Sequence, residues 1–219
     1  MTRVRIDLFS SLDGFSSTTD QTAENPMGED WGRLTAAYGA TRTFRERVLG
    51  DASGAGTTGL DDRYAARHNE GTGAEIMGAA MFGLHSFPDD PDWKGWWGEE
   101  PPFGYPVFVL TGNAPRAPIP MRGGTTFHFR NAAIEEVLAE AKEAAGGLDV
   151  RVGGGVSTAR AFLCAGLVDD LHVMVAPILL DQGSRLWDDL RGLERTHHVK
   201  SEVAESGTIH VTFTRKDAS

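Results

Sequence analysis

Residues 149–163 read DVRVGGGVSTARAFL, and this stretch decides the fold of the chain. A short β-branched run ends at Gly153-Gly154-Gly155, and Val156, Ser157 and Thr158 then open an alanine-rich segment. This order is typical of a strand, a tight turn and a helix N-terminus. Glycines let the backbone approach an anion closely, and the first helical turn adds unpaired N–H groups and the positive end of the helix dipole. The stretch therefore predicts a phosphate-binding turn.

Two features leave an alternative to this interpretation open. The third glycine of the G-x-G-x-x-G pattern is absent, and no lysine follows as it does in a P-loop. A turn that is tight for packing alone is the alternative.

The composition fits one globular domain with a sizeable core. The chain has 219 residues, of which 40% are hydrophobic and 24% are charged. The formal charge of −10 argues against nucleic acid and against an anionic membrane as partners, because both need a clustered basic surface. No apolar run is long enough to span a bilayer, and the N-terminus does not resemble a signal sequence. We therefore expect a cytoplasmic protein.

The chain has one cysteine, Cys164. A single cysteine excludes an internal disulfide and a cysteine-based metal site, and the sequence predicts no metal site. Within its expected helix, we expect Cys164 to be a small buried side chain rather than a nucleophile.

Strands and helices alternate along most of the chain. Apolar or alternating runs predict strands, and one apolar stripe predicts a helix that Asn131 caps and that Gly146-Gly147 ends. The expected strands lie near residues 4–8, 75–78, 107–111, 125–129, 149–153 and 171–180, with a final hairpin over 199–213. This pattern predicts an α/β sandwich of three layers with a mostly parallel central sheet and an antiparallel C-terminal hairpin.

Two stretches lack a regular pattern. Residues 18–73 carry at most a helix over 30–49 and a shorter one over 61–69, so they form either a lid or binding loop or a tolerated surface insertion. Residues 89–105 place three tryptophans among prolines, which forbid a regular element. These tryptophans either pin the loop to the core or form an aromatic wall for a planar ligand.

Polar groups follow three of the expected strands where each strand ends. Asp13 follows the first, Thr111 ends another, and Gly153–Thr158 follow a third. Ligands of parallel α/β sheets bind outside the carboxyl ends of the strands. We therefore expect a nucleotide-sized ligand along this rim, although an Asp-Gly pair such as Asp13-Gly14 is also an ordinary turn former.

An ordered set of short motifs resembles the dihydrofolate-reductase-like family. Within that family, the set is most similar to the reductase domain of bacterial bifunctional riboflavin-biosynthesis deaminase-reductases. It covers nearly the whole chain outside residues 18–73. The motifs are Ser11-Leu12-Asp13-Gly14-Phe15, Ile76-Met77-Gly78, Pro106 to Thr111, Gly123 to Phe127, Val152 to Gly155, Ala165 to His172 and Pro177 to Leu180.

The resemblance implies a stand-alone reductase domain over residues 1–219, with a long insert or lid at about 18–73. It implies an NADPH-dependent enzyme, often a homodimer, that acts on a small molecule. By the resemblance, the cofactor pyrophosphate would be bordered by Gly153, Gly154, Gly155, Val156, Ser157 and Thr158. The adenosine end would contact Thr111, Gly112 and Asn113, and Gly78 would be a further cofactor-binding residue. The loop with Ser11 and Asp13 would border the nicotinamide and the substrate. Ala79 replaces an arginine that commonly follows Met-Gly and can grip the 2′-phosphate, so NADH stays open, as does a reduced flavin or deazaflavin.

The implied chemistry is hydride transfer to a polarised C=N or C=O carbon of a small heterocyclic or carbonyl substrate, such as a pteridine or a ribosylaminopyrimidine. One acid would protonate the neighbouring heteroatom, and Asp13 is the candidate for that donor or for orienting the substrate. The alternative from another class is a non-catalytic nucleotide-binding protein on the same fold.

Overall fold

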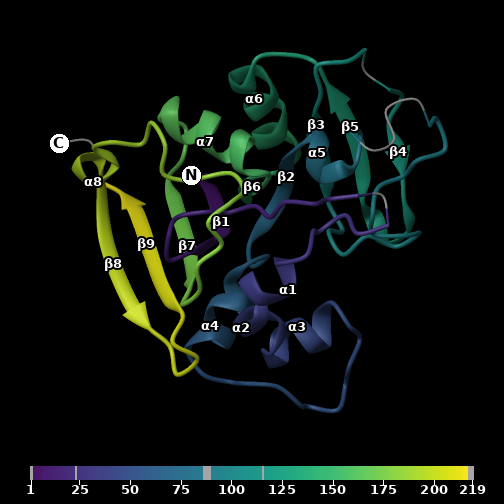
Figure 1. The fold of residues 1–219 in the computed structure, drawn as a ribbon. Helices are drawn as coiled ribbons and strands as arrows, with labels where there is room; N and C mark the ends of the chain where they lie inside the picture. Colours follow the sequence, from purple (N-terminus) through teal and green to yellow (C-terminus); the bar gives the residue numbers. More distant parts are fainter. Residues whose placement is uncertain (1, 23, 86–89, 115, 217–219) are drawn as a thin grey trace. The chain divides into compact units, whose positions relative to one another are not determined.

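The computed structural model describes residues 2–22, 24–85, 90–114 and 116–216 (Figure 1). The chain divides into two compact units. The first comprises residues 1–6 and 71–168, and the second comprises residues 7–70 and 169–219. Strand β1 (Val4–Ser11) contributes residues to both units.

The first unit contains the glycine-rich stretch and a set of mainly parallel strands. Its strands are β2 (Thr72–Gly78), β3 (Pro106–Leu110), β4 (Ile119–Pro120), β5 (Thr126–Arg130) and β6 (Asp149–Gly154). Strands β2, β3, β5 and β6 are joined by parallel pairings, and β4 alone pairs antiparallel, with β5. Parallel strands joined by crossovers bury both faces, which explains why β2 is buried along its whole length.

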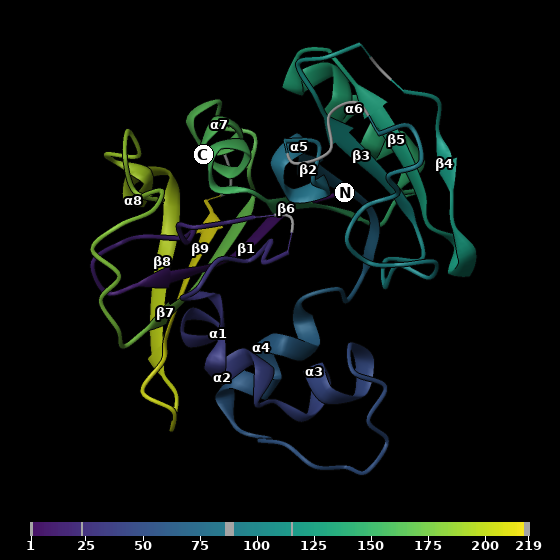
Figure 2. The same cartoon turned by 45° about the vertical axis from the view of Figure 1, so that its right-hand side comes forward.

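Both faces of these strands are covered. Helix α6 (Ile134–Ala144) packs its stripe of Val137, Leu138 and Ala141 on β2, β3 and β6, and α7 (Val156–Cys164) packs on β6 and β2. Figures 1 and 2 both show α6 beside these strands. Opposite-facing residues of β2, β3 and β5 form an apolar cluster with α5 (Ala79–Phe82); its buried members are Met77, Phe82, Leu84, Val107, Val109, Phe127 and Phe129.

The tryptophan-rich loop packs against this cluster. Trp93 and Trp97 are partly buried on it, and Trp93 Nε1 donates a hydrogen bond of 2.9 Å to the carbonyl of Phe82. These contacts are those of a loop pinned to the core. The short 3-10 helix η1 (Arg122–Gly124) lies between β4 and β5 in the chain.

The second unit combines antiparallel strands with small helices. Its strands are β7 (Asp170–Ala176), β8 (His197–Val203) and β9 (Ile209–Arg215), in which β9 pairs antiparallel with both β7 and β8. Its helices are α1 (Trp31–Leu34), α2 (Ala36–Gly39), α3 (Arg42–Arg47), α4 (Leu60–Arg67) and α8 (Leu193–Thr196). Helices α1 to α4 form one group in both views (Figures 1 and 2).

The predicted fold class is confirmed. The strands form a nine-stranded sheet in the order β4-β5-β3-β2-β6-β1-β7-β9-β8, with helices in the crossovers and the expected antiparallel hairpin of β8 and β9 at the C-terminal end. No helix in the described part of the chain is long and apolar enough to cross a membrane.

Several local predictions were wrong. The helix expected over 30–49 is three short helices, because Gly39 ends α2 and Thr41 caps α3 by accepting a hydrogen bond from Phe44 N. Strand β7 ends at Ala176 rather than Leu180, because Pro177 has no N–H for the ladder.

Two side chains also differ from expectation. Asn131 does not cap α6, whose N-cap is Ala133, but donates to the carbonyls of Gly112 and Asn113. Cys164 is exposed rather than buried, since Val156, Ala159, Phe162 and Leu163 supply the buried side of α7.

Candidate functional site

Three of the predicted cofactor-binding segments lie at one edge of the first unit. Gly78 ends β2 opposite Leu110 of β3, and Met77 lies opposite Gly154, which ends β6. Since β6, β2 and β3 are adjacent and parallel, their carboxyl ends meet at the same edge. The structure therefore brings Gly78, the loop that begins at Thr111 and the glycine turn together.

The three glycines of the turn serve different purposes. A Cβ on Gly153 would lie 2.0 Å from Glu75 Oε1, so this glycine makes room for a carboxylate on the neighbouring strand. Gly154 has a φ of +131°, which side chains disfavour. A Cβ on Gly155 would meet no described atom within 4 Å, and Gly155 is the N-cap of α7. Space for a ligand therefore opens at Gly155, where the unpaired N–H groups of α7 begin.

The first turn of α7 contributes polar side chains on two sides. Ser157 is exposed, whereas Thr158 faces strand β2, because a Cβ on Gly78 would lie 2.5 Å from Thr158 Oγ1. Gly78 therefore permits the close approach of α7 to β2. Val156 is buried and fixes the start of the helix.

The loop after β3 is held by hydrogen bonds at its base. Thr111 is buried, its N–H donates to the carbonyl of Arg130 at 2.9 Å, and its Oγ1 accepts from Asn113 N at 3.1 Å. Asn131 Nδ2 donates to the carbonyls of Gly112 and Asn113 at 3.1 and 3.3 Å. Gly112 and Asn113 are themselves exposed, so a fixed backbone presents them to solvent at the rim.

A buried polar group lies under the glycine turn, and sequence reasoning missed it. Arg151 Nη1 donates to Glu75 Oε2 at 2.9 Å, and Tyr105 Oη donates to the same oxygen at 3.1 Å. The Glu75 side chain is fully buried, and Arg151 is nearly so. Glu75 and Arg151 face each other in the β2–β6 register. The signal was a charged residue in the interior of each of two otherwise apolar strands, and only the strand register shows that the two residues form a pair.

Burial and the Glu75 carboxylate raise the pKa of Tyr105, so its hydroxyl stays protonated and keeps donating to Glu75. The carboxylate is thus held between a guanidinium and a phenol. A fully buried carboxylate needs such partners, because removing a charge from water is costly. This group of three, Glu75, Arg151 and Tyr105, fixes the position of Gly153 above it.

The predicted substrate-side residues lie in the second unit. Ser11 Oγ donates to Asp13 Oδ1 at 2.5 Å, and the backbone N–H groups of Leu180 and Asp181 donate to the same carboxylate at 2.8 to 3.2 Å. These bonds, led by the one from Ser11, lower the pKa of Asp13 to about 2. Asp13 is therefore a carboxylate at neutral pH that ties the loop after β1 to the segment after β7.

In the described residues, no three histidine, cysteine, aspartate or glutamate side chains are placed to hold a metal ion.

We predict that Gly153→Ala destabilises the fold whereas Gly155→Ala does not. The added methyl at residue 153 collides with Glu75, which can move only by weakening its bonds to Arg151 and Tyr105. Overpacking of this kind costs about 1–3 kcal/mol. Thermal unfolding of both variants measures the difference, and equal melting temperatures would show that Glu75 yields freely.

We predict that the Asp13 carboxylate stabilises its loop at neutral pH and not in acid. Its pKa is lowered from 3.8 to about 2, so the stabilisation is present above about pH 4 and is lost as the pH falls toward 2. Acid unfolding of wild type and Asp13→Asn should differ in this window, with the variant less sensitive to pH. Parallel curves would contradict the role assigned to these hydrogen bonds.

Comparison with known proteins gives the same fold. The model of the RibD C-terminal domain family matches residues 2–210. A protein from Shewanella sp. PV-4 assigned to riboflavin biosynthesis shares 22% identity at a TM-score of 0.61, with 98% of this chain and 99% of that chain covered. A search of curated protein sequences finds no match.

Two enzymes are also similar in structure. The Thermotoga maritima diaminohydroxyphosphoribosylaminopyrimidine deaminase/5-amino-6-(5-phosphoribosylamino)uracil reductase shares 14% identity at a TM-score of 0.56, with 98% of this chain and 57% of that chain covered. Enterococcus faecalis dihydrofolate reductase, in complex with NADP(H) and RAB-propyl, shares 13% sequence identity at a TM-score of 0.50, with 98% of this chain and 97% of that chain covered. Because the family model spans nearly the whole sequence, the chain belongs to the RibD C-terminal domain family, a family of reductases.

Proposed function

We propose that this chain is an NADPH-dependent reductase of a small heterocyclic substrate. The observation that carries the proposal is the open space at Gly155, where the N-terminus of the nine-residue helix α7 meets the carboxyl ends of β6 and β2. Such a helix terminus offers N–H groups and a positive dipole end to a pyrophosphate. Family membership supports the reductase activity, and the NADP(H) complex of the similar dihydrofolate reductase supports the cofactor.

The residues of the rim fit this cofactor. Backbone N–H groups of Val156, Ser157 and Thr158 would bind the pyrophosphate, and the exposed Gly112 and Asn113 would contact the adenosine end. A bound dihydronicotinamide supplies the hydride. The chain itself contributes orientation: the Glu75 group fixes the turn, and the hydrogen bonds of Asn131 fix the adenosine-side loop.

Asp13 suits the orientation of the substrate better than the donation of a proton. Its carboxylate already accepts hydrogen bonds from Ser11, Leu180 and Asp181, and its pKa of about 2 leaves no proton on it at neutral pH. Within the proposed reaction, Asp13 holds the loop that borders the substrate, and the proton comes from another donor.

Two residues bear on the choice between NADPH and NADH. Ala79 begins α5 and has no charge for a 2′-phosphate. Arg116 is one basic side chain that could supply this charge instead; its Cζ lies 6.0 Å from the ring centroid of Phe129, and its Nη1 is 3.5 Å from the carbonyl of Trp93. The proposed substrate class is a pteridine or a ribosylaminopyrimidine. The proposed assembly is a homodimer, which analytical sedimentation would detect.

Binding of a nicotinamide nucleotide without turnover would support the non-catalytic alternative. Binding of only a reduced flavin or deazaflavin would show that this group, and not NADPH, is the cofactor.

We predict that NADPH binds and that Gly155→Ala weakens its binding. A methyl at residue 155 fits the protein but occupies the space assigned to the pyrophosphate. Tryptophan fluorescence during titration with NADPH and NADH gives both dissociation constants. Gly32→Ala is the matched control, because its added Cβ also meets no described atom within 4 Å and lies in α1. Failure of folded wild type to bind either nucleotide would refute the nicotinamide reductase.

We predict that Ala79→Arg raises the affinity for NADPH selectively. A guanidinium forms charge-assisted, bidentate bonds with a phosphate, which NADH lacks at the 2′ position. A bond of this kind contributes about 1.5–3 kcal/mol, so the gain is on the order of tenfold to a hundredfold. The same titrations measure it, and an equal change for both nucleotides would show that residue 79 does not face the 2′ position.

A further inference from the structure

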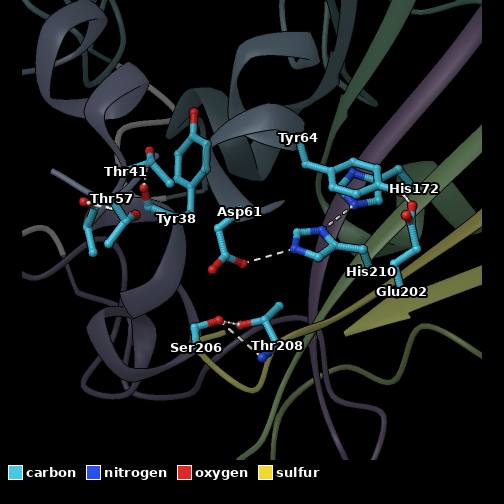
Figure 3. A network of polar contacts seen from close by, with 11 residues as sticks. Tyr38, Thr41, Thr57, Asp61, Tyr64, His172, Glu202, Ser206, Thr208 and His210 are labelled. Carbon is cyan, nitrogen blue, oxygen red and sulfur yellow. Dashed lines mark hydrogen bonds and ion pairs between the residues drawn. The ribbon is translucent and has the colours of Figure 1, made fainter. Parts of the chain in front are cut away.

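A row of four hydrogen-bonded side chains runs from β1 through β7 and β9 to helix α4 in the second unit. Figure 3 shows three of them, His172, His210 and Asp61. Asp7 Oδ1 lies 3.1 Å from His172 Nδ1, His172 Nε2 lies 3.0 Å from His210 Nδ1, and His210 Nε2 lies 2.9 Å from Asp61 Oδ1. We call Asp7, His172, His210 and Asp61 the histidine row. The reaction proposed above uses none of them.

The histidine row is buried and covered by an aromatic ring. His210 is fully buried, and the other three side chains are about one-tenth exposed or less. The ring of Tyr64 stacks on His172 at 4.3 Å and on His210 at 4.2 Å, with interplanar angles of 16° and 7°. Figure 3 shows Tyr64 lying over both imidazoles. An aromatic face in this position also favours a cation beneath it.

The row has more hydrogen-bond contacts than its side chains have protons when both imidazoles are neutral. Each of its three contacts needs one hydrogen between the two heavy atoms, so the row needs three. Carboxylates bring none, and two neutral imidazoles bring one each. With only two protons, either two nitrogen lone pairs face each other at 3.0 Å or a lone pair faces a carboxylate. The observed distances therefore require one additional proton.

The additional proton belongs on an imidazole rather than on a carboxyl group. A free imidazole binds a proton more tightly than a free carboxylate does, and a carboxylate within hydrogen-bond distance, as Asp7 Oδ1 is at 3.1 Å from His172 Nδ1, favours the charged form of an imidazole further. His210 is the more deeply buried ring, and its burial lowers its pKa by more than the hydrogen bond to Asp61 raises it. His210 is thus the neutral ring, with its Nε2–H donating to Asp61. Its Nδ1 then accepts from His172, which carries a proton on both nitrogens.

We propose that the histidine row is a proton-binding site in which His172 is an imidazolium at neutral pH, and that this proton fastens helix α4 to strands β1, β7 and β9. Without it, one contact of the row becomes repulsive, and Asp61 no longer attaches α4 through a complete chain of hydrogen bonds. The row carries two carboxylates and one imidazolium, hence a charge of −1.

Other charged groups near the row lie on α4 and β8. On α4, Arg63 and Arg67 act on Tyr64, and the Arg67 guanidinium lies 5.8 Å from its ring centroid. On β8, Glu202 accepts from Tyr64 Oη at 2.8 Å and pairs with Lys200 at 3.0 Å. Burial and Glu202 raise the pKa of Tyr64 to about 12, so Tyr64 stays neutral wherever histidine titrates.

The attachment of α4 extends to its neighbour. Asp62, next to Asp61, accepts a hydrogen bond of 2.8 Å from Thr43 N of α3. Helix α4 therefore links α3 to the strands. Raising the pH would loosen this helical part of residues 18–73, the stretch whose pattern suggested either a lid or a surface insertion.

Nitrogen-15 NMR of the imidazoles in the wild-type protein tests the charge directly. At pH 7 we expect two protonated nitrogens on His172 and a proton only on Nε2 of His210. A His172 ring with a single proton would overturn the proposal. This measurement needs no variant and therefore stands if a substitution prevents folding.

The variant Asp61→Asn tests the link between the proton and the attachment of α4. An asparagine amide can donate to His210 Nε2, so His210 Nδ1–H donates to His172 and two neutral imidazoles complete the row. In urea, the unfolding equilibrium constant of wild type should rise about tenfold per pH unit above pH 6.5, the slope for one linked proton. Asp61→Asn should show no such rise.

Asp62→Asn is the matched control, because it removes the same charge one residue away while its amide oxygen can still accept from Thr43. Its pH dependence should equal that of wild type. Equal slopes for wild type and Asp61→Asn would overturn the proposal. So would a loss of slope in Asp62→Asn as large as in Asp61→Asn, because charge alone would then explain the effect.

Discussion

The first unit depends on one constraint, the contact between the buried carboxylate of Glu75 and the backbone at Gly153. The carboxylate cannot be hydrated there, so it takes Arg151 and Tyr105 as partners. These partners hold it in the volume that a side chain at residue 153 would need. Packing therefore requires a glycine at residue 153, and the backbone conformation favours a glycine at residue 154. Only Gly155 is left for a ligand, so packing and the proposed phosphate binding share the same three residues.

The sequence predicted the positions of the strands better than the roles of individual side chains. A buried parallel strand has an apolar run, from which β3 and β6 were predicted, and the alternation of apolar and polar residues predicted the antiparallel β8–β9 hairpin. The C-terminal ends of these strands place Gly78, Thr111 and Gly154 at one edge, as the topology required. Asn131 was misjudged because capping is a local rule, and its amide instead binds a loop 18 to 19 residues earlier in the chain.

What the sequence could not reveal lies in contacts between distant residues. Glu75 and Arg151 are 76 positions apart, and His210 and Asp61 are 149 apart. Each appears in the sequence as an isolated polar residue in an apolar or irregular stretch. Residues 18–73 looked unpatterned for a related reason: α4 buries only a few apolar residues, such as Leu60 and Ala65, and is attached as well through polar groups of Asp61 and Tyr64.

The two units thus use buried charge in different ways. In the first, Arg151 is charged over the whole physiological range, so the support of the glycine turn does not depend on pH. In the second, histidines take the place of arginine, and an imidazolium can lose its proton where a guanidinium cannot. A permanent ion pair suits a turn that keeps one geometry for the proposed phosphate. A titratable row suits a group of short helices, none longer than eight residues, that is held to the strands by few contacts and can be released by the loss of one proton.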